Sequence, residues 1–221
     1  GFVAGAATAL SEKIKADDAA AKEMATVQTR NMLNRYNEIK TKNEELSSKL
    51  KSNVQTVKGY FPQLNEDQLF EAAKNPAFME GIAQVKKDRN FDPASIDASS
   101  LIKLSGEVSG KTAYQRINEL IDNSIASAPA SPPPEGLGFF EARAARTAQQ
   151  QFAKNAAMVG VAPEKLRGAM NYKAPELTSE AEFNLGELYK GSQSFAEQKD
   201  AAMRAALVCL LYTSPSPRDA T

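Results

Sequence analysis

The stretch GEVSGKT, residues 106–112, comes nearest in this chain to the residue types and order of a nucleotide-binding site. Gly110, Lys111 and Thr112 match the end of a P-loop, in which backbone amides surround phosphates and the lysine contacts the terminal ones. The spacing fails because that motif requires glycine where Ser105 stands. No βαβ pattern supplies the parallel sheet on which a P-loop is built. We therefore expect a glycine-containing link between two helices here, and no nucleotide or other cofactor.

Adjacent carboxylates are the second group of residues that could do chemistry, because glycosidases use two carboxyl groups to cleave a sugar linkage. The chain has three such pairs on expected helices, namely Asp17-Asp18, Glu44-Glu45 and Glu66-Asp67. We expect all three on solvated faces, where no burial would raise a pKa. No lysozyme-like signature accompanies any of them. The pairs therefore predict charged helix surfaces, and we expect no catalytic residue in the chain.

The residue inventory excludes several further classes of chemistry. The 221 residues include no His and no Trp, and the only cysteine is Cys209. Zinc sites use His or Cys ligands, and Ser-His or Cys-His catalysis requires a histidine base. The 27 basic and 27 acidic residues balance, whereas a domain that binds nucleic acid carries a basic excess. Composition thus argues against a metal centre, a nucleophilic hydrolase and a nucleic-acid partner.

The ending CLLYTSPSPRDAT, residues 209–221, differs abruptly from the Ala-rich helical pattern before it. Its residues 209–219 resemble one reading frame of a transposon adapter used in shotgun DNA library preparation, because suitable codons match at all eleven positions. A natural Ser-Pro-rich tail is the alternative. We expect this stretch to be an adapter-derived artefact that lies apart from the core. The remainder would then be a cysteine-free metagenomic fragment whose natural ends lie beyond those given.

Residues 11–58 predict one long helix, since they contain no Gly or Pro and are rich in Ala, Glu, Lys, Gln and Leu. A helix of that length would extend about 70 Å at 1.5 Å per residue. Its second half carries positions that follow one another in alternating steps of four and three residues. These positions, hereafter the seam, are Met32, Tyr36, Ile39, Asn43, Leu46, Leu50, Asn53 and Val57.

The seam has the spacing of a coiled coil, with Asn43 at an a position. A polar Asn at such a position fixes register or oligomer number at some cost in stability. The seam therefore predicts self-association. A long amphipathic helix packed against its own chain is the alternative, because it would show the same apolar face.

The remaining pattern predicts an all-α chain of short helical modules that is extended rather than compact. We expect helices over 66–74, 76–88, 93–104, 112–123, 139–159 and 163–170, with capping boxes at Ser179/Glu182 and Ser194/Glu197. Alternating strand patterns are missing. The expected divisions are an apolar Gly/Ala lead (1–10), the long helix (11–58), a small helical module (59–123), a Pro-rich linker (124–136), a second helical module (137–208) and the artefact (209–221).

The lead GFVAGAATALSEKI, followed by a long charged helix and by helical modules joined through a Pro-rich link, resembles uncharacterised structural proteins of tailed phages, especially marine phages. The resemblance covers roughly residues 1–125 and carries over no functional residue. It implies a virion component. We expect a non-enzymatic structural or assembly protein that acts through helix–helix association. Its partners would be a second copy of itself, bound through the seam, and other virion proteins.

Two other functions stay open at this point. The apolar segment 1–10 could contact a membrane, although no window of the chain holds the 18 or more apolar residues that a span requires. Alternatively, the chain is a non-catalytic piece of a larger phage enzyme, such as a cell-wall hydrolase. Outside a virion, we expect a soluble cytoplasmic protein.

Overall fold

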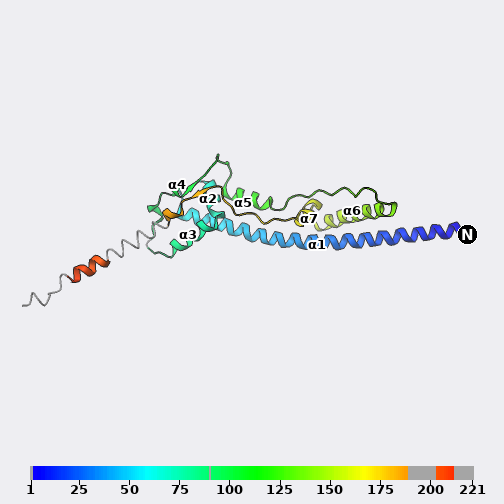
Figure 1. The fold of residues 1–221 in the computed structure, drawn as a ribbon, viewed down its shortest axis with the longest axis horizontal. Coiled ribbons are helices and arrows are strands. Elements are labelled where there is room, and N and C mark those ends of the chain that lie inside the picture. Colours follow the sequence, from blue (N-terminus) through cyan, green and yellow to red (C-terminus); the bar gives the residue numbers. More distant parts are fainter. Residues whose placement is uncertain (1, 90, 189–202, 212–221) are drawn as a thin grey trace, which may run out of the picture. The chain divides into compact units, whose positions relative to one another are not determined.

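The computed structural model describes residues 2–89, 91–188 and 203–211. These residues confirm the predicted all-α class: a long N-terminal helix is followed by short helices and by one pair of two-residue strands (Figure 1). The helices are α1 (Phe2–Tyr60), α2 (Glu66–Lys74), α3 (Pro76–Lys86), α4 (Ala98–Leu101), α5 (Ala113–Asp122), α6 (Phe139–Val159) and α7 (Pro163–Ala169), with a 3-10 turn at Pro93–Ser95 and a further helical segment at 203–211.

Helix α1 is longer than the sequence suggested. The expected helix covered residues 11–58, whereas α1 has 59 residues and includes the Gly/Ala lead. The lead joins the helix because alanine has the highest helix propensity of any residue. At the other end Gly59 does not terminate α1, and the backbone N–H of Phe61 still donates to the carbonyl of Val57 at 2.8 Å.

The chain forms two compact units, each assembled from two separated stretches. Unit 1 comprises Gly1–Ser47 and Glu119–Pro175, and unit 2 comprises Ser48–Asn118 and Glu176–Thr221. The sequence suggested consecutive modules at 59–123 and 137–208, joined by a spacer at 124–136. The structure corrects that division, because chain segments far apart in sequence pack together in each unit.

In unit 1, α6 lies alongside the N-terminal part of α1 (Figure 1). The two helices run in the same direction: Asp18 contacts Arg143, and further along Thr29 contacts Asn155. A parallel pair requires a long connection back to the starting end, and the Pro-rich segment provides part of it. The segment also packs, since the N–H of Ala128 donates to a carbonyl of α7 at 3.0 Å. It is therefore part of unit 1 rather than a spacer between modules.

Unit 2 contains the larger apolar core. Two local signals that the sequence supplies are present: Asn65 and Gln68 form a reciprocal capping box at the start of α2, and Asn75 caps α3, which begins with proline. The buried large side chains of the unit include Leu50, Val57, Phe61, Leu69, Phe70, Phe78, Ile82, Val85, Leu101, Ile102, Ile117 and Leu188.

The strand pair was missed at the sequence level. Strands β1 (Ile102–Lys103) and β2 (Glu182–Phe183) pair antiparallel, with Ile102 opposite Phe183. The predicted helix over 93–104 is wrong as a single helix, because the 3-10 turn at Pro93–Ser95 and the four-residue helix α4 are separated by residues 96–97, and β1 follows α4 directly. The helix start predicted at Ser179/Glu182 is wrong because Glu182 belongs to β2. Two-residue strands are too short to show an alternating pattern. The second predicted capping box, at Ser194/Glu197, lies outside the described residues.

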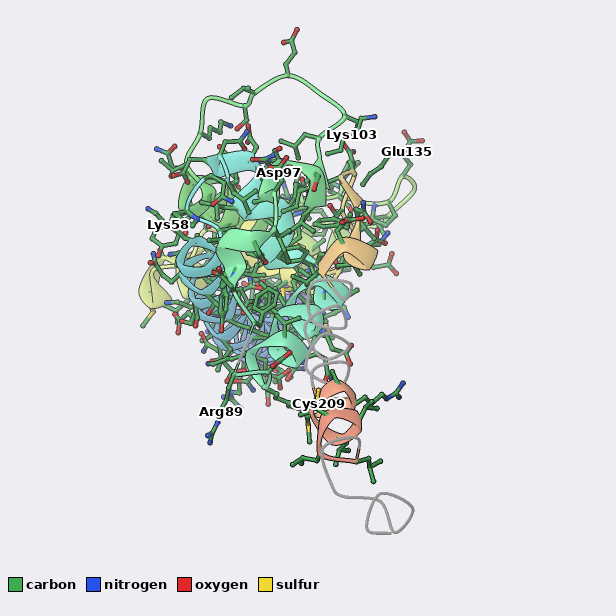
Figure 2. The ribbon with its side chains drawn as sticks, turned by 90° about the vertical axis from the view of Figure 1, so that its left-hand side faces the viewer. Lys58, Arg89, Asp97, Lys103, Glu135 and Cys209 are labelled. Atoms are coloured by element: carbon green, nitrogen blue, oxygen red, sulfur yellow. The ribbon has the colours of Figure 1, made fainter. Side chains whose placement is uncertain are left out.

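Only the beginning of the 209–221 stretch falls within the described residues. Cys209 and the two leucines after it complete the helical segment 203–211, and all three are exposed; Figure 2 shows Cys209 on this segment. Figure 2 also labels Lys58, Asp97 and Lys103, which are exposed residues of unit 2. The adapter origin of the stretch stays a prediction. Among the described helices, none is long and apolar enough to cross a membrane.

Candidate functional site

Unit 2 contains a buried cluster of charged side chains on α2 and α5. Asp67 and Glu71 lie one turn apart on α2 and are only 4% and 6% exposed. Arg116 of α5 reaches both carboxylates, with its Nη1 3.0 Å from Asp67 Oδ1 and its Nη2 3.7 Å from Glu71 Oε1. We call these residues, together with Ser109 and Ser179, the Asp67 cluster.

Asp67 is held as a carboxylate by the loop that precedes α5. The backbone N–H of Ser109 donates to Asp67 Oδ2 at 3.0 Å, and the Ser109 hydroxyl donates to Oδ1, which also accepts from Arg116. Burial alone would raise the pKa of Asp67, but the hydrogen bonds from Ser109 and the charge of Arg116 outweigh it. The pKa of Asp67 therefore lies below its ordinary value, and the group is ionised at neutral pH.

Glu71 links the segment that contains Ser179 to the Asp67 cluster. Its Oε2 accepts a hydrogen bond from Ser179 Oγ at 2.6 Å and lies 3.4 Å from Lys74 Nζ. The ring of Phe70 lies close to Arg116 and to Lys74. Arg116 Cζ lies 4.2 Å and Lys74 Nζ 4.7 Å from the ring centroid, within the range of cation–π attraction.

The arrangement suits positioning rather than proton transfer. A general acid at neutral pH needs a carboxyl whose pKa is raised, whereas the pKa of Asp67 is lowered. Both oxygens of Asp67 and both oxygens of Glu71 already contact donors of the chain. A cavity of only about 100 Å³ adjoins the cluster. The Asp67 cluster therefore connects α2, α5 and two loops through charge-assisted hydrogen bonds.

The GEVSGKT stretch is the loop between β1 and α5, and its polar groups are used within the chain. Ser109 donates to Asp67 through backbone and side chain, so this loop surrounds an internal carboxylate. Thr112 caps α5: its Oγ1 accepts from the N–H of Gln115 at 3.1 Å, and Gln115 Oε1 accepts from the N–H of Thr112 at 3.0 Å. The loop links a short strand to a helix, a small correction to the expected link between two helices.

The three carboxylate pairs differ in their surroundings. Glu44 and Glu45 are exposed, as expected. The expectation of a solvated face is wrong for Asp67, which the loop before α5 covers. Its neighbour Glu66 is exposed, and its Oε2 accepts from the N–H of Ala113 at 2.8 Å. Asp18 is half-buried and pairs with α6 in unit 1. No three His, Cys, Asp or Glu side chains among the described residues form a group that could hold a metal ion.

Every seam residue lies on α1, and the structure places much of the seam inside the chain's own fold. Ile39, Asn43, Leu50 and Val57 are buried, whereas Met32, Tyr36, Leu46 and Asn53 are half-buried.

Polar contacts show what covers the seam. In unit 1, Asn43 Nδ2 donates to Ser124 Oγ at 3.0 Å, and the hydroxyl of Tyr172 donates to Asn43 Oδ1 at 3.2 Å. In unit 2, Asn53 Nδ2 donates to the carbonyl of Ala73 at 2.9 Å. This packing corresponds to the alternative that the sequence left open, a long amphipathic helix covered by its own chain. Self-association through the seam stays a prediction.

Sequence reasoning did not find Ser109, Arg116 or Ser179, the partners of the two buried carboxylates. They lie far from α2 in sequence, and Ser179 contacts a residue 108 positions away. Comparison of the chain with protein-family models, with curated proteins and with solved structures gives no match.

Proposed function

We propose that this chain is a non-enzymatic structural or assembly protein, a component of a tailed-phage virion, that acts through helix–helix association. The phage assignment rests on the resemblance of the lead, the long charged helix and the Pro-rich link. Association through α1 rests on its length of 59 residues and on the part of its surface that other segments leave open.

One observation carries the association. Val3, Leu10 and Met24 of α1 are 81%, 49% and 62% exposed, and multiples of seven residues separate them. Side chains at heptad spacing share one face of a supercoiled helix, where a second helix can cover them. Asp17 interrupts the row at the intervening heptad position, in an ion pair with Lys13 at 3.7 Å. We call Val3, Leu10 and Met24 the exposed row, and its proposed occupant is the same helix of a second copy.

We assign to the exposed row the self-association that the sequence predicted for the seam. Seam residues such as Leu50 and Ile39 are buried within the chain, so a partner helix would have to displace existing contacts to reach them. The exposed row requires no such displacement. A Leu46→Glu variant would place a charge at a half-buried seam position and would test folding as much as association.

Sedimentation of the full chain with Leu10 and Met24 both changed to Glu tests the association. Both side chains are exposed, so the double variant keeps its helix content in circular dichroism. The wild-type chain should sediment above its mass of 23.8 kDa, and the double variant at that mass. The matched control is Thr8→Glu with Ala19→Glu, two exposed α1 positions that lie two or five residues from row positions and so on the opposite side of the helix. It should keep the wild-type mass. A wild type that sediments as a single chain at every concentration would refute the association.

The other two parts of the proposal have separate tests. Capsid, portal or tail genes next to the encoding gene support the virion assignment, and metabolic genes in their place contradict it. A peptidoglycan-degrading activity of the purified chain would contradict the non-enzymatic part, which draws its support from the paired state of Asp67 and Glu71.

A further inference from the structure

A polar cavity of about 390 Å³ lies in unit 1 between α1 and α6 (Figure 1 shows the two helices side by side). Its size falls in the range of small-molecule sites, which span roughly 300–1,000 Å³. It is separate from the Asp67 cluster and from the exposed row. Its lining includes neither a residue of the Asp67 cluster nor a residue of the exposed row.

The lining of this cavity is rich in positive charge, although the whole chain has a net charge of zero. Lys22 of α1 and Arg143, Arg146 and Lys154 of α6 line it, against the single carboxylate of Asp18. Charges of one sign that converge on a concave surface attract a ligand of the opposite sign. The local imbalance therefore favours an anion, which net charge alone would not reveal.

Most of these cations are available to a ligand. Arg143 Nη2 pairs with Asp18 Oδ2 at 3.1 Å, but Arg143 Nε is buried and has no hydrogen-bond partner among the described residues. Lys22, Arg146 and Lys154 are exposed and form no ion pair within the described part of the chain. An unpaired buried donor in a native structure calls for a partner such as an ion.

The cations are spread along the cavity rather than gathered at one point. From Arg143 to Lys154 is eleven residues of α6, about 16 Å at 1.5 Å per residue. The amides of Gln150 and Gln151 line the wall between them and can serve as neutral donors. Such a row fits an extended anion with several negative groups better than a single compact one.

We propose that this cavity binds linked phosphate groups, with the Arg143 and Arg146 guanidinium groups and the Lys22 and Lys154 ammonium groups contacting phosphate oxygens. Guanidinium and ammonium are the side-chain groups that proteins use for phosphate. The same chemistry is carried by inorganic polyphosphate, by a nucleoside triphosphate and by a nucleic-acid strand. The proposal is independent of the structural role proposed above.

Isothermal titration calorimetry of the full chain at low ionic strength tests the site, with sodium tripolyphosphate, ATP and a short oligodeoxythymidylate as separate ligands. The test variant is Lys22→Glu with Arg146→Glu, which reverses two exposed charges of the lining. We expect the affinity for the bound phosphate ligand to fall about tenfold or more, which corresponds to about 1.4 kcal/mol. Added salt should weaken binding to the wild type.

The matched control is Lys40→Glu with Lys42→Glu, which reverses two exposed charges of α1 outside the cavity. It should bind as the wild type does. A preference for tripolyphosphate or ATP identifies a small phosphate ligand, and a preference for the oligonucleotide identifies the nucleic-acid source of the same groups. The proposal is overturned if none of the three ligands binds, or if the control loses as much affinity as the cavity variant. Lys154→Gln, a neutral change, should give a smaller loss and guards against misfolding of the charge-reversed variant.

Discussion

Replacement of Asp67 by Asn measures what the Asp67 cluster contributes to unit 2. The change preserves the shape of the side chain but removes its charge, and it turns one acceptor oxygen into a donor that faces donors of Ser109 or Arg116. A hydrogen bond to a charged group contributes about 1.5–3 kcal/mol to stability. The asparagine keeps one acceptor, and Arg116 keeps Glu71, so we expect a loss of about 2 kcal/mol. For a chain of this size that lowers Tm by about 4–8 °C.

The pH dependence of this loss follows from the lowered pKa of Asp67. A carboxyl whose pKa is lower in the folded state stabilises the fold fully above its unfolded value, here 3.8. That contribution is lost as the pH falls from this value through the lower folded-state pKa. The asparagine of the variant does not titrate. The difference in stability between wild type and Asp67→Asn should therefore be constant near neutral pH and should shrink once the solution is acidified below about pH 4.

Urea unfolding followed by circular dichroism, over a series of pH values, measures both quantities. Asp122→Asn, an exposed carboxylate of α5, serves as the control and should change stability by less than about 0.5 kcal/mol. Ser109→Ala combined with Asp67→Asn should cost less than the sum of the two single changes, because both remove the same contacts. Equal stability of wild type and Asp67→Asn at neutral pH would refute the reasoning. A gap that stays constant into strong acid would refute the assignment of the lowered pKa.

Three further substitutions probe the packing within the units, Gly168→Ala and Asn43→Leu in unit 1 and Gly59→Ala in unit 2. Gly168→Ala would place a Cβ atom against the carbonyl oxygen of Ala126, so thermal unfolding should show a loss of about 1–3 kcal/mol in stability. Gly59→Ala, in open space on α1, should instead gain about 0.5–1 kcal/mol in stability. Asn43→Leu should cost about 1–3 kcal/mol in urea unfolding, because Tyr172 and Ser124 lose their partner. A coiled coil through the seam predicts the opposite, a gain in stability with a change in sedimenting mass.

Local signals predicted the helices whose ends depend on neighbouring residues. The helix predicted over 66–74 has the same bounds as α2, whose start is set by the local capping box of Asn65 and Gln68. The Ala-rich run 139–159 gave both ends of α6, and its C-terminal Gly160 adopts a φ of +73°, a conformation open to glycine at low cost. These features need contacts only within a few residues. A single sequence therefore contains the information for them.

Contacts between distant segments could not be predicted in the same way. Asp67 meets a partner 49 residues away in Arg116, and no spacing rule connects α2 with α5. One signal was present: Asp67, Phe70, Glu71 and Lys74 follow the i, i+3, i+4, i+7 spacing of a single helix face. An aromatic ring among charges on one face indicates a half-buried polar surface. The identity of the covering segment depends on the fold as a whole.

The seam shows why a heptad pattern alone leaves the partner open. Its spacing requires that some chain segment cover one face of α1, because apolar side chains such as Leu50 gain stability when they leave water. The same spacing is satisfied whether the cover comes from a second copy or from the same chain. Asn43 illustrates this: the polar group that would set the register of a coiled coil instead bonds Ser124 and Tyr172 of its own chain. Any association through α1 is then confined to the surface that other segments of the chain do not cover. The exposed row, which includes Val3 and Leu10, is therefore the part of the helix to change first, rather than the seam.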